Sequence, residues 1–346
     1  MPTSQVPLQP GQRPRQSKKK KKKTARKIAR ICLLVLPCVL VLCILGVLGY
    51  GVWLNSQLKR TVIDQDNSAL GIEDWYDDAK YDDVTNIALF GIDTRQGESS
   101  RSDAVMVLTV DRKRNKMKAT SLLRDSLVTI QGRADKEKLA HAYAYGGPQL
   151  AIRTINENFG LNIRDYVTVD FDSMAKIVDA VGGVVIDVKE NELESTNRSI
   201  QEYCSYYDVE PTYVNTPGEQ LLNGMQACGY SRVRYDGVGD DRQRTDRQRR
   251  VIEQVFNKVK KMNPLEYPGL ANKIVPLLET SMSTSQILGL GTSVLMSGAA
   301  EFEQARFPMN VDLEPGNYNG ASVILFDAET TKQKLHDFLF EDIQPE

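Results

Sequence analysis

Short apolar runs and helical patterns alternate along the chain from residue 86 to residue 341. Five apolar runs have the length of buried strands, at residues 86–91, 104–110, 117–123, 166–170 and 184–188. Apolar residues with a helical period occur at 148–159 and 172–181, and glycines follow both segments. Strands that alternate with helices predict an α/β layered domain built around a central sheet.

The second half of this domain has a less regular pattern. Residues 191–215 are polar and aromatic and predict an irregular excursion, and residues 217–227 predict a short helix. The last elements that the pattern predicts are helices at 268–278 and 283–296, a strand at 322–326 and a helix at 328–340. The spacing marks no internal boundary, so we expect residues 86–341 to form one domain.

Residues 231–250 carry seven arginines and four aspartates but no lysine. Arginine offers phosphate or carboxylate groups a rigid fork of donors and stays charged. The apolar positions that follow predict a helix through Lys260, and its buried face counts back to Gln248 and Arg244. Polar side chains on that face predict the mouth of a pocket. The alternative is a charged helix with internal Arg–Asp pairs. In either case we expect the side chains of Arg242, Arg249 and Arg250 to be exposed to solvent.

Charge and hydropathy divide the N-terminal part of the chain. Residues 1–30 hold eleven Lys or Arg and no acid, and residues 31–54 hold no charge. The second stretch is long enough to span a bilayer, and the basic tail before it favours the cytoplasm. We therefore predict a cell-membrane protein with one transmembrane helix (31–54), a juxtamembrane linker (55–85) and an extracellular domain. A cleaved signal peptide is the rival interpretation.

The rest of the composition restricts the partners and the redox state. Beyond residue 30 the chain has 33 basic and 45 acidic side chains, which disfavours nucleic-acid binding. Three cysteines lie in the predicted span, and Cys204 and Cys228 lie outside it. An even pair in an oxidising compartment favours a disulfide, and the alternative is two separate thiols.

Arg and Asp residues lie at one end of each of the first three apolar runs. Asp93 follows the first run, Arg101 and Asp103 precede the second, and Arg124 follows the third. Three such pairs within about forty residues suggest that they converge, since ligands of α/β sheets gather at strand ends. The alternative is a purely structural role, in which Arg–Asp ion pairs brace the loops.

These residue types suit one kind of chemistry. The chain has no Gly-x-Ser-x-Gly motif and no Cys–His pair, and its two histidines make a histidine-based metal centre improbable. Asp93 and Asp103 are oxygen ligands of the kind that Mg²⁺ or Mn²⁺ uses together with substrate phosphates. Arginines and a metal ion together fit a pyrophosphate, whose charge they offset.

An ordered set of motifs resembles the extracellular domain of the LytR-CpsA-Psr family. The motifs are Gly91-Ile-Asp93-Thr-Arg95, Arg101-Ser-Asp103, Ser121-Leu-Leu-Arg124-Asp125, Lys138-Leu-Ala-His141-Ala-Tyr143-Ala-Tyr145-Gly146-Gly147, Arg232-Val-Arg234 and Asp241-Arg-Gln-Arg244-Thr-Asp-Arg247-Gln248. The resemblance implies an α/β/α fold with a central mixed sheet and a hydrophobic pocket for a polyprenyl chain. One departure is the charged segment Asp240-Asp241-Arg242-Gln243, where a glycine is usual.

The resemblance also implies roles for individual residues. Asp93 and Asp103 would hold the metal ion. The pyrophosphate would be bound by Arg101, Arg124, Lys138, Arg232, Arg234, Arg244 and Gln248, with Lys136 as the competitor of Lys138. Arg247 is a second choice that either binds the pyrophosphate or braces the site. Asp103 is the candidate base, and it joins Arg101, Arg124 and Arg244 as the expected catalytic set.

The implied activity is a phosphotransferase that moves an anionic glycopolymer, such as teichoic acid or capsule, from a polyprenyl-pyrophosphate carrier to peptidoglycan. A muramic acid hydroxyl would attack the sugar-linked phosphorus. Two other functions use the same residues. A polyprenyl-pyrophosphate pyrophosphatase would use water as the acceptor, and a surface protein that binds polyprenyl lipid would catalyse nothing.

Overall fold

A computed structural model describes residues 50–73, 79–93, 101–233, 241–296 and 301–345 of the chain. The chain divides into two compact units, Met1–Trp53 and Leu54–Glu346, and the elements below belong to the second. Within the described ranges no helix combines the length and the apolar character that a membrane crossing requires. Residues 31–49 of the predicted span lie outside those ranges.

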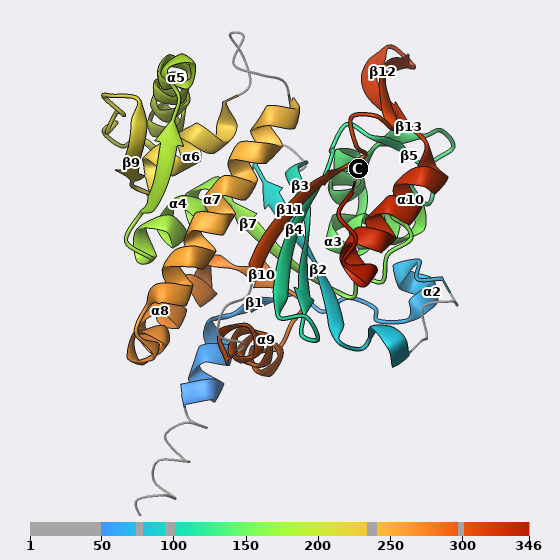
Figure 1. Cartoon of the computed structure of the whole chain (residues 1–346), viewed down its shortest axis with the longest axis horizontal. Helices are drawn as coiled ribbons and strands as arrows, with labels where there is room; N and C mark the ends of the chain where they lie inside the picture. Colours follow the sequence, from blue (N-terminus) through green and yellow to red (C-terminus); the bar gives the residue numbers. More distant parts are fainter. Residues whose placement is uncertain (1–49, 74–78, 94–100, 234–240, 297–300, 346) are drawn as a thin grey trace, which may run out of the picture. The chain divides into compact units, whose positions relative to one another are not determined.

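A seven-stranded sheet forms the centre of the second unit (Figure 1). Across the sheet the strands are β1 (Lys59–Arg60), β10 (Glu279–Thr280), β7 (Asp165–Asp170), β2 (Val84–Ile92), β3 (Ser102–Asp111), β4 (Lys116–Leu122) and β11 (Glu301–Phe307). β7 and β11 run parallel to β2 and β4, whereas β3 is antiparallel to both β2 and β4. The predicted central mixed sheet is therefore confirmed.

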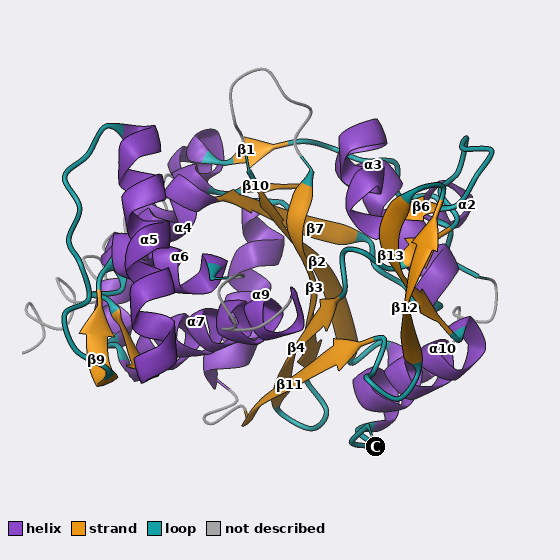
Figure 2. Ribbon diagram, turned by 90° about the horizontal axis from the view of Figure 1, so that it is seen from above, coloured by secondary structure: helices purple, strands orange, loops and turns teal. Residues whose placement is uncertain are grey.

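Helices and short strands cover one face of this sheet (Figure 2). Apolar side chains of β2, β3 and β4 pack there against helical residues such as Ile155, Phe159 and Phe338 in one buried cluster. The elements of this layer are α2 (Asn67–Leu70), β5 (Leu127–Val128), β6 (Glu137–Lys138), α3 (Leu139–Phe159), β12 (Leu313–Tyr318), β13 (Ala321–Phe326), α10 (Ala328–His336) and the π-helical turn η5 (Asp337–Glu341).

A second helical layer with its own core lies on the other face (Figure 2). It contains α4 (Phe171–Ala180), β8 (Val184–Val188), α5 (Glu190–Tyr207), β9 (Gly218–Leu222), α6 (Gly224–Arg232) and α7 (Asp241–Lys261). The remaining elements are η2 (Ala79–Tyr81), η3 (Pro264–Glu266), α8 (Tyr267–Ile274), η4 (Val275–Leu277) and α9 (Thr284–Met296). Two helical layers around a mixed sheet give the α/β/α arrangement that the sequence predicts.

Two of the predicted elements are wrong, and both lie in the second layer. Residues 191–215, predicted to be irregular, contain most of α5, because Thr196, Ile200, Tyr203 and Cys204 form a buried stripe at helical spacing. The helix predicted at 217–227 is replaced by β9 and α6. β9 pairs antiparallel with β8, so a partner distant in sequence decides its conformation.

Residues 54–72 belong to the folded unit, although the sequence assigns most of them to a linker. β1 pairs with β10 at the edge of the sheet, and Ile63, Leu70 and Ile72 are buried in the core on the α3 side. The compact unit therefore begins at Leu54 and not at residue 86.

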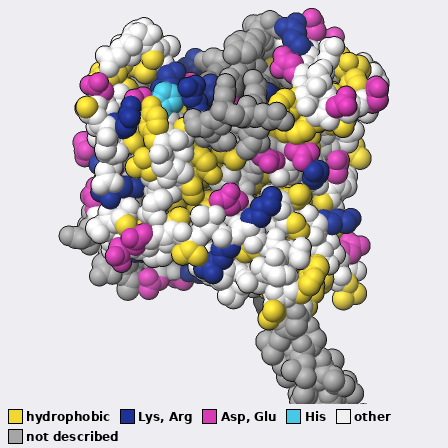
Figure 3. Space-filling model, turned by 180° about the vertical axis from the view of Figure 1, so that it is seen from behind, with side chains coloured by type: hydrophobic (Ala, Val, Ile, Leu, Met, Phe, Trp, Pro, Cys, Tyr) yellow, Lys and Arg dark blue, Asp and Glu magenta, His cyan; other side chains and the backbone are white. Residues whose placement is uncertain are grey.

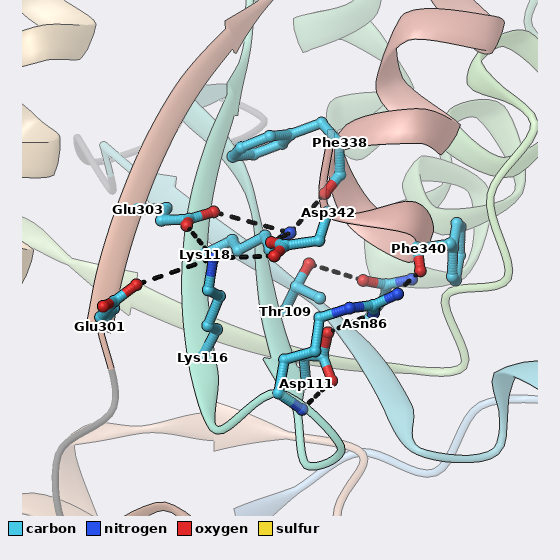
Figure 4. A network of polar contacts seen from close by, with 11 residues as sticks. Asn86, Thr109, Asp111, Lys116, Lys118, Glu301, Glu303, Phe338, Phe340 and Asp342 are labelled. Atoms are coloured by element: carbon cyan, nitrogen blue, oxygen red, sulfur yellow. Dashed lines mark hydrogen bonds and ion pairs between the residues drawn. The ribbon is translucent and has the colours of Figure 1, made fainter. Parts of the chain in front are cut away.

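Two lysines of β4 anchor the C-terminal segment to the sheet (Figure 4). Lys118 is fully buried, and its Nζ lies 2.7 Å from Asp342 Oδ1 and also donates to the Phe338 carbonyl oxygen. Lys116 Nζ donates to Glu303 Oε1 at 2.7 Å and to Asp342 Oδ2 at 2.8 Å. Burial alone would raise the pKa of Asp342, but the hydrogen bonds from Lys116 and Lys118 lower it below its ordinary value.

Candidate active site

Three strand ends bring charged residues together at one edge of the sheet. Because β2, β3 and β4 are successively antiparallel, Ile92 pairs with Ser102, and Val105 pairs with Leu122. Asp103 and Arg124 therefore face each other, and Arg124 Nη1 forms a short ion pair with Asp103 Oδ1. The prediction that these Arg–Asp ends converge is confirmed.

The end of α6 brings a second arginine to this edge. Arg232 is the last residue of α6, and its Nη2 lies 3.9 Å from Asp93 Oδ2. Its guanidinium also lies over the ring of Phe171, 4.5 Å from the ring centroid. A guanidinium held between a carboxylate and an aromatic face keeps a fixed orientation.

The first turns of α7 supply the buried polar residues that the apolar stripe predicts. Arg244 and Gln248 are 1% and 8% exposed, and they lie two turns and one turn before the buried Val251. Arg244 Nη2 donates to the Asp103 carbonyl oxygen at 3.0 Å, which ties α7 to β3. The side-chain oxygen of Gln248 is buried and has no hydrogen-bond partner among the described residues. A buried acceptor of this kind is suited to a ligand group that donates a hydrogen bond.

An apolar pocket opens beside Gln248, between the sheet and the helices α4 and α7. It is a narrow pocket with a cavity volume of about 50 Å³ and an open side. Side chains from the sheet and from the second helical layer line it, including Leu89, Met106, Phe171, Met174, Gln248 and Ile252. The pocket therefore offers a hydrocarbon environment next to the cluster of arginines and aspartates.

Three of the other predicted ligands lie around this cluster or outside the described residues. Lys138 Nζ pairs with Asp125 Oδ1 at 2.8 Å, and Asp125 Oδ2 lies 3.7 Å from Arg124 Nε, so Lys138 joins the site through Asp125. Arg101 is exposed just before β3, and Arg234 lies outside the described residues. In a space-filling view, Lys and Arg side chains gather around a histidine at the upper edge of one face (Figure 3).

Arg247 braces two helices of the second layer. Its Nε donates to Glu192 Oε1 at 2.9 Å, and its Nη1 donates to the Val233 carbonyl oxygen at 3.1 Å. Both charged side chains are buried, at 3% and 7% exposure. These bonds correspond to the bracing role that we gave Arg247 as the alternative to pyrophosphate binding.

The expectation that Arg249 is solvated is wrong. Arg249 is 6% exposed, and its Nη1 donates to Ser121 Oγ at 2.7 Å, while Nη2 pairs with Asp246. Burial lowers the pKa of Arg249 below its ordinary value, although Asp246 opposes the shift. Arg249 therefore joins α7 to β4. The spacing of apolar residues along α7 does not indicate this role.

The predicted disulfide between Cys204 and Cys228 is also corrected. Both residues are buried free thiols in the core of the second layer. The Cys204 sulfur lies 3.2 Å from the Met225 sulfur, and the Cys228 sulfur lies 3.6 Å from the Phe171 carbonyl oxygen. Burial raises the pKa of Cys228 to about 12. Each thiol thus packs as a small apolar group with its own neighbours.

Asp93 and Asp103 are the predicted ligands of a metal ion. Among the residues that the structure describes, no three His, Cys, Asp or Glu side chains are grouped to hold one. Two carboxylates on neighbouring strands nevertheless fit Mg²⁺ or Mn²⁺, because such ions take one or two carboxylates and complete their shell with phosphate oxygens and water. A cation at Asp103 would share this carboxylate with Arg124.

Comparisons with known proteins agree with this architecture. A model of the LytR_cpsA_psr family matches residues 52–337. The regulatory protein MsrR of Staphylococcus aureus is 30% identical over 267 residues, which are 76% of each chain. The polyisoprenyl-teichoic acid–peptidoglycan teichoic acid transferase TagU of Bacillus anthracis is 31% identical over 68% of this chain and 70% of TagU.

Solved structures share the fold as well. The LytR-CPS2A-psr family protein YwtF (TagT), with bound octaprenyl pyrophosphate lipid, superimposes with a TM-score of 0.58 and 21% identity, over 80% of this chain and 99% of that one. The match of the family model over most of the chain, together with the identity to MsrR, shows the family. This chain belongs to the LytR-CpsA-Psr family.

Proposed function

We propose that this protein is a membrane-anchored phosphotransferase that moves an anionic glycopolymer from a polyprenyl-pyrophosphate carrier to peptidoglycan. The observation that carries the proposal is the juxtaposition of Arg124, Arg232 and Arg244 with an apolar pocket. A pyrophosphate needs cationic donors and a prenyl chain needs a hydrocarbon environment, and both are present at one edge of the sheet. The names of TagU and of the lipid-bound TagT support this substrate class.

The prenyl chain would enter the pocket between the sheet and α4, with its pyrophosphate at the pocket mouth. Arg124, Arg232 and Arg244 would hold the phosphate oxygens, and the side-chain NH2 of Gln248 would donate to the phosphate nearest the prenyl chain. Mg²⁺ or Mn²⁺ bound by Asp93 and Asp103 would offset negative charge on the pyrophosphate. Fixed guanidinium groups stabilise charge that develops during transfer without reorganising.

Transfer would proceed by attack of a peptidoglycan hydroxyl on the phosphorus that carries the sugar. A bond forms between the acceptor oxygen and this phosphorus. The bond to the bridging oxygen breaks, and polyprenyl phosphate leaves with that oxygen and its electron pair. Asp103 would take the proton of the hydroxyl, since it lies at the site edge with Arg124 orienting its carboxylate.

The proposal includes the membrane topology predicted from residues 1–54. A basic tail in the cytoplasm and one spanning helix would place the domain outside the cell, where peptidoglycan is the acceptor. The same anchor would keep the pocket close to the bilayer that supplies its lipid substrate. Labelling of the Arg60→Cys variant by a cysteine-specific reagent in intact cells tests this topology, and labelling that requires cell lysis would contradict it.

The activity is tested with the full-length protein, a lipid-pyrophosphate-linked glycan and peptidoglycan strands. Arg244→Ala and Asp103→Ala are each expected to lower kcat/KM about 100-fold or more, because each removes a fixed charge next to the reacting phosphates. Arg250→Ala is the matched control, since this exposed arginine of α7 donates to Tyr230 Oη outside the site. Full transfer by both site variants would refute the proposal.

The same assay separates the two alternatives. Release of polyprenyl phosphate without attachment of glycan to peptidoglycan would identify a pyrophosphatase. Binding of the lipid with no turnover, with or without added Mg²⁺, would identify a lipid-binding protein. Loss of transfer after chelation and its return with Mg²⁺ is the result expected for the metal site.

A further inference from the structure

A second pocket begins where the apolar pocket ends. Its cavity volume is about 510 Å³, and its lining includes Asp93, Phe171 and Arg232. Phe171 lines both pockets, and the guanidinium of Arg232 lies 4.5 Å from the centroid of its ring. This pair therefore separates a hydrocarbon environment from a polar one. A pyrophosphate at Arg232 would have its lipid on one side and the second pocket on the other.

One face of α5 forms the far wall of this second pocket. Arg198, Gln201, Glu202 and Ser205 line it at positions i, i+3, i+4 and i+7, so they share one side of the helix. Tyr206 extends this wall and is 47% exposed. The helix itself is held in place by the buried ion pair between Glu192 and Arg247. The wall is therefore a set of exposed polar groups on a rigid support.

The chemistry of the lining selects a kind of ligand. Two arginines and two carboxylates balance each other, and an amide, a hydroxyl and two tyrosines complete the surface. Tyr206 and Tyr207 meet edge to face with ring centroids 4.9 Å apart, which leaves an aromatic face exposed beside hydrogen-bonding groups. Burial raises the pKa of Tyr207 to about 12, so its hydroxyl remains a neutral donor and acceptor. Donors and acceptors around an aromatic face suit a neutral ligand that carries many hydroxyl or amide groups.

We infer that the second pocket, with Gln201 and Tyr206 on its α5 wall, binds an uncharged sugar ring of the transferred or the accepting glycan. The inference rests on the proposed function, and it deepens it by assigning a sugar site to the α5 side of the arginine cluster. A cavity volume of about 510 Å³ is large enough for one or two rings, since pockets for small ligands measure roughly 300–1,000 Å³. Tyr206 would stack on the ring, and Gln201 would bond to its hydroxyl or acetamido groups.

The experiment measures KM separately for the lipid-linked donor and for the peptidoglycan acceptor, with the full-length protein. Gln201→Ala and Tyr206→Ala are expected to raise one of these KM values about tenfold, with kcat changed less than twofold. A raised donor KM identifies the sugar next to the pyrophosphate, and a raised acceptor KM identifies a peptidoglycan sugar. Asn191→Ala and Tyr213→Ala are matched controls, because they remove an exposed amide from α5 and an exposed tyrosine from outside the pocket.

The two failures can be distinguished. If the wild type transfers glycan and both pocket variants keep its KM for donor and acceptor, the sugar site is refuted and the proposed function stands. A fall in kcat with both KM values unchanged would also refute it, since a binding site acts on KM. A wild type that transfers nothing would overturn the proposed function and, with it, this inference. Both substituted side chains are exposed, so the variants should unfold at the wild-type temperature.

Discussion

Replacing Arg247 with methionine should destabilise the domain, because it leaves the Glu192 carboxylate buried without its counter-ion. The Glu192 side chain is 7% exposed, and its second oxygen keeps one hydrogen bond, from the Lys189 backbone N–H at 3.0 Å. Removing one partner of a buried ion pair costs about 3–5 kcal/mol. We expect a loss of this size in the free energy of unfolding, measured by urea denaturation with circular dichroism.

A double-mutant cycle shows whether the loss comes from the ion pair. Glu192→Gln keeps an acceptor for the Lys189 N–H but removes the charge, so the double variant should recover about 2 kcal/mol relative to the sum of the single losses. The exposed pair Arg198–Glu194 is the control, with N and O 3.3 Å apart and side chains 52% and 89% exposed. Breaking it should cost less than about 1 kcal/mol. Additive losses in the cycle, or equal costs for the two pairs, would refute the reasoning.

Three further predictions follow from the packing, the C-terminal network and the thiols. Gly224→Ala should destabilise the domain by about 2 kcal/mol or more, measured by urea denaturation, because the added Cβ would lie 1.9 Å from the Ala175 carbonyl oxygen. Gly269→Ala is the control, because open space surrounds Gly269 and the substitution should leave the stability unchanged. Asp342→Asn should lower the free energy of unfolding by about 2 kcal/mol at pH 7. Because the pKa of Asp342 is lowered in the folded state, this difference should persist above about pH 4 and vanish as the pH falls through the folded pKa. A constant difference down to pH 2 would contradict this prediction. Cys204 and Cys228 should both react with a thiol reagent after denaturation without prior reduction, and mass spectrometry that finds them linked would contradict the structure.

The parts of the site that the sequence could predict are those with a local signal. Asp93, Asp103 and Arg124 end apolar runs, and antiparallel neighbours bring such ends together. Gln248 and Arg244 interrupt a helical stripe, and helix geometry alone places them on the buried face.

Other features depend on partners that a local pattern does not contain. Arg247 and Arg249 are chemically identical and two positions apart, yet one meets Glu192, 55 positions away, and the other meets Ser121, 128 positions away. β9 is a strand because β8 pairs with it, although its residues favour a helix as well. The same holds for β11 (Glu301–Phe307), an edge strand that we did not predict, because its register depends on β4.

The lysine network of β4 has a consequence for the order in which the domain is assembled during synthesis. Lys116 and Lys118 obtain their counter-ions from residues 185 to 226 positions later in the chain. Until those residues have been made, burying Lys118 would leave an ammonium group unpaired in an apolar environment, which is strongly unfavourable. A nascent chain that ends before Glu301 lacks all of these carboxylates, so we expect β4 to stay hydrated until residues 301–342 have been made. The long separation of these contacts also makes slow folding the expected behaviour of this domain.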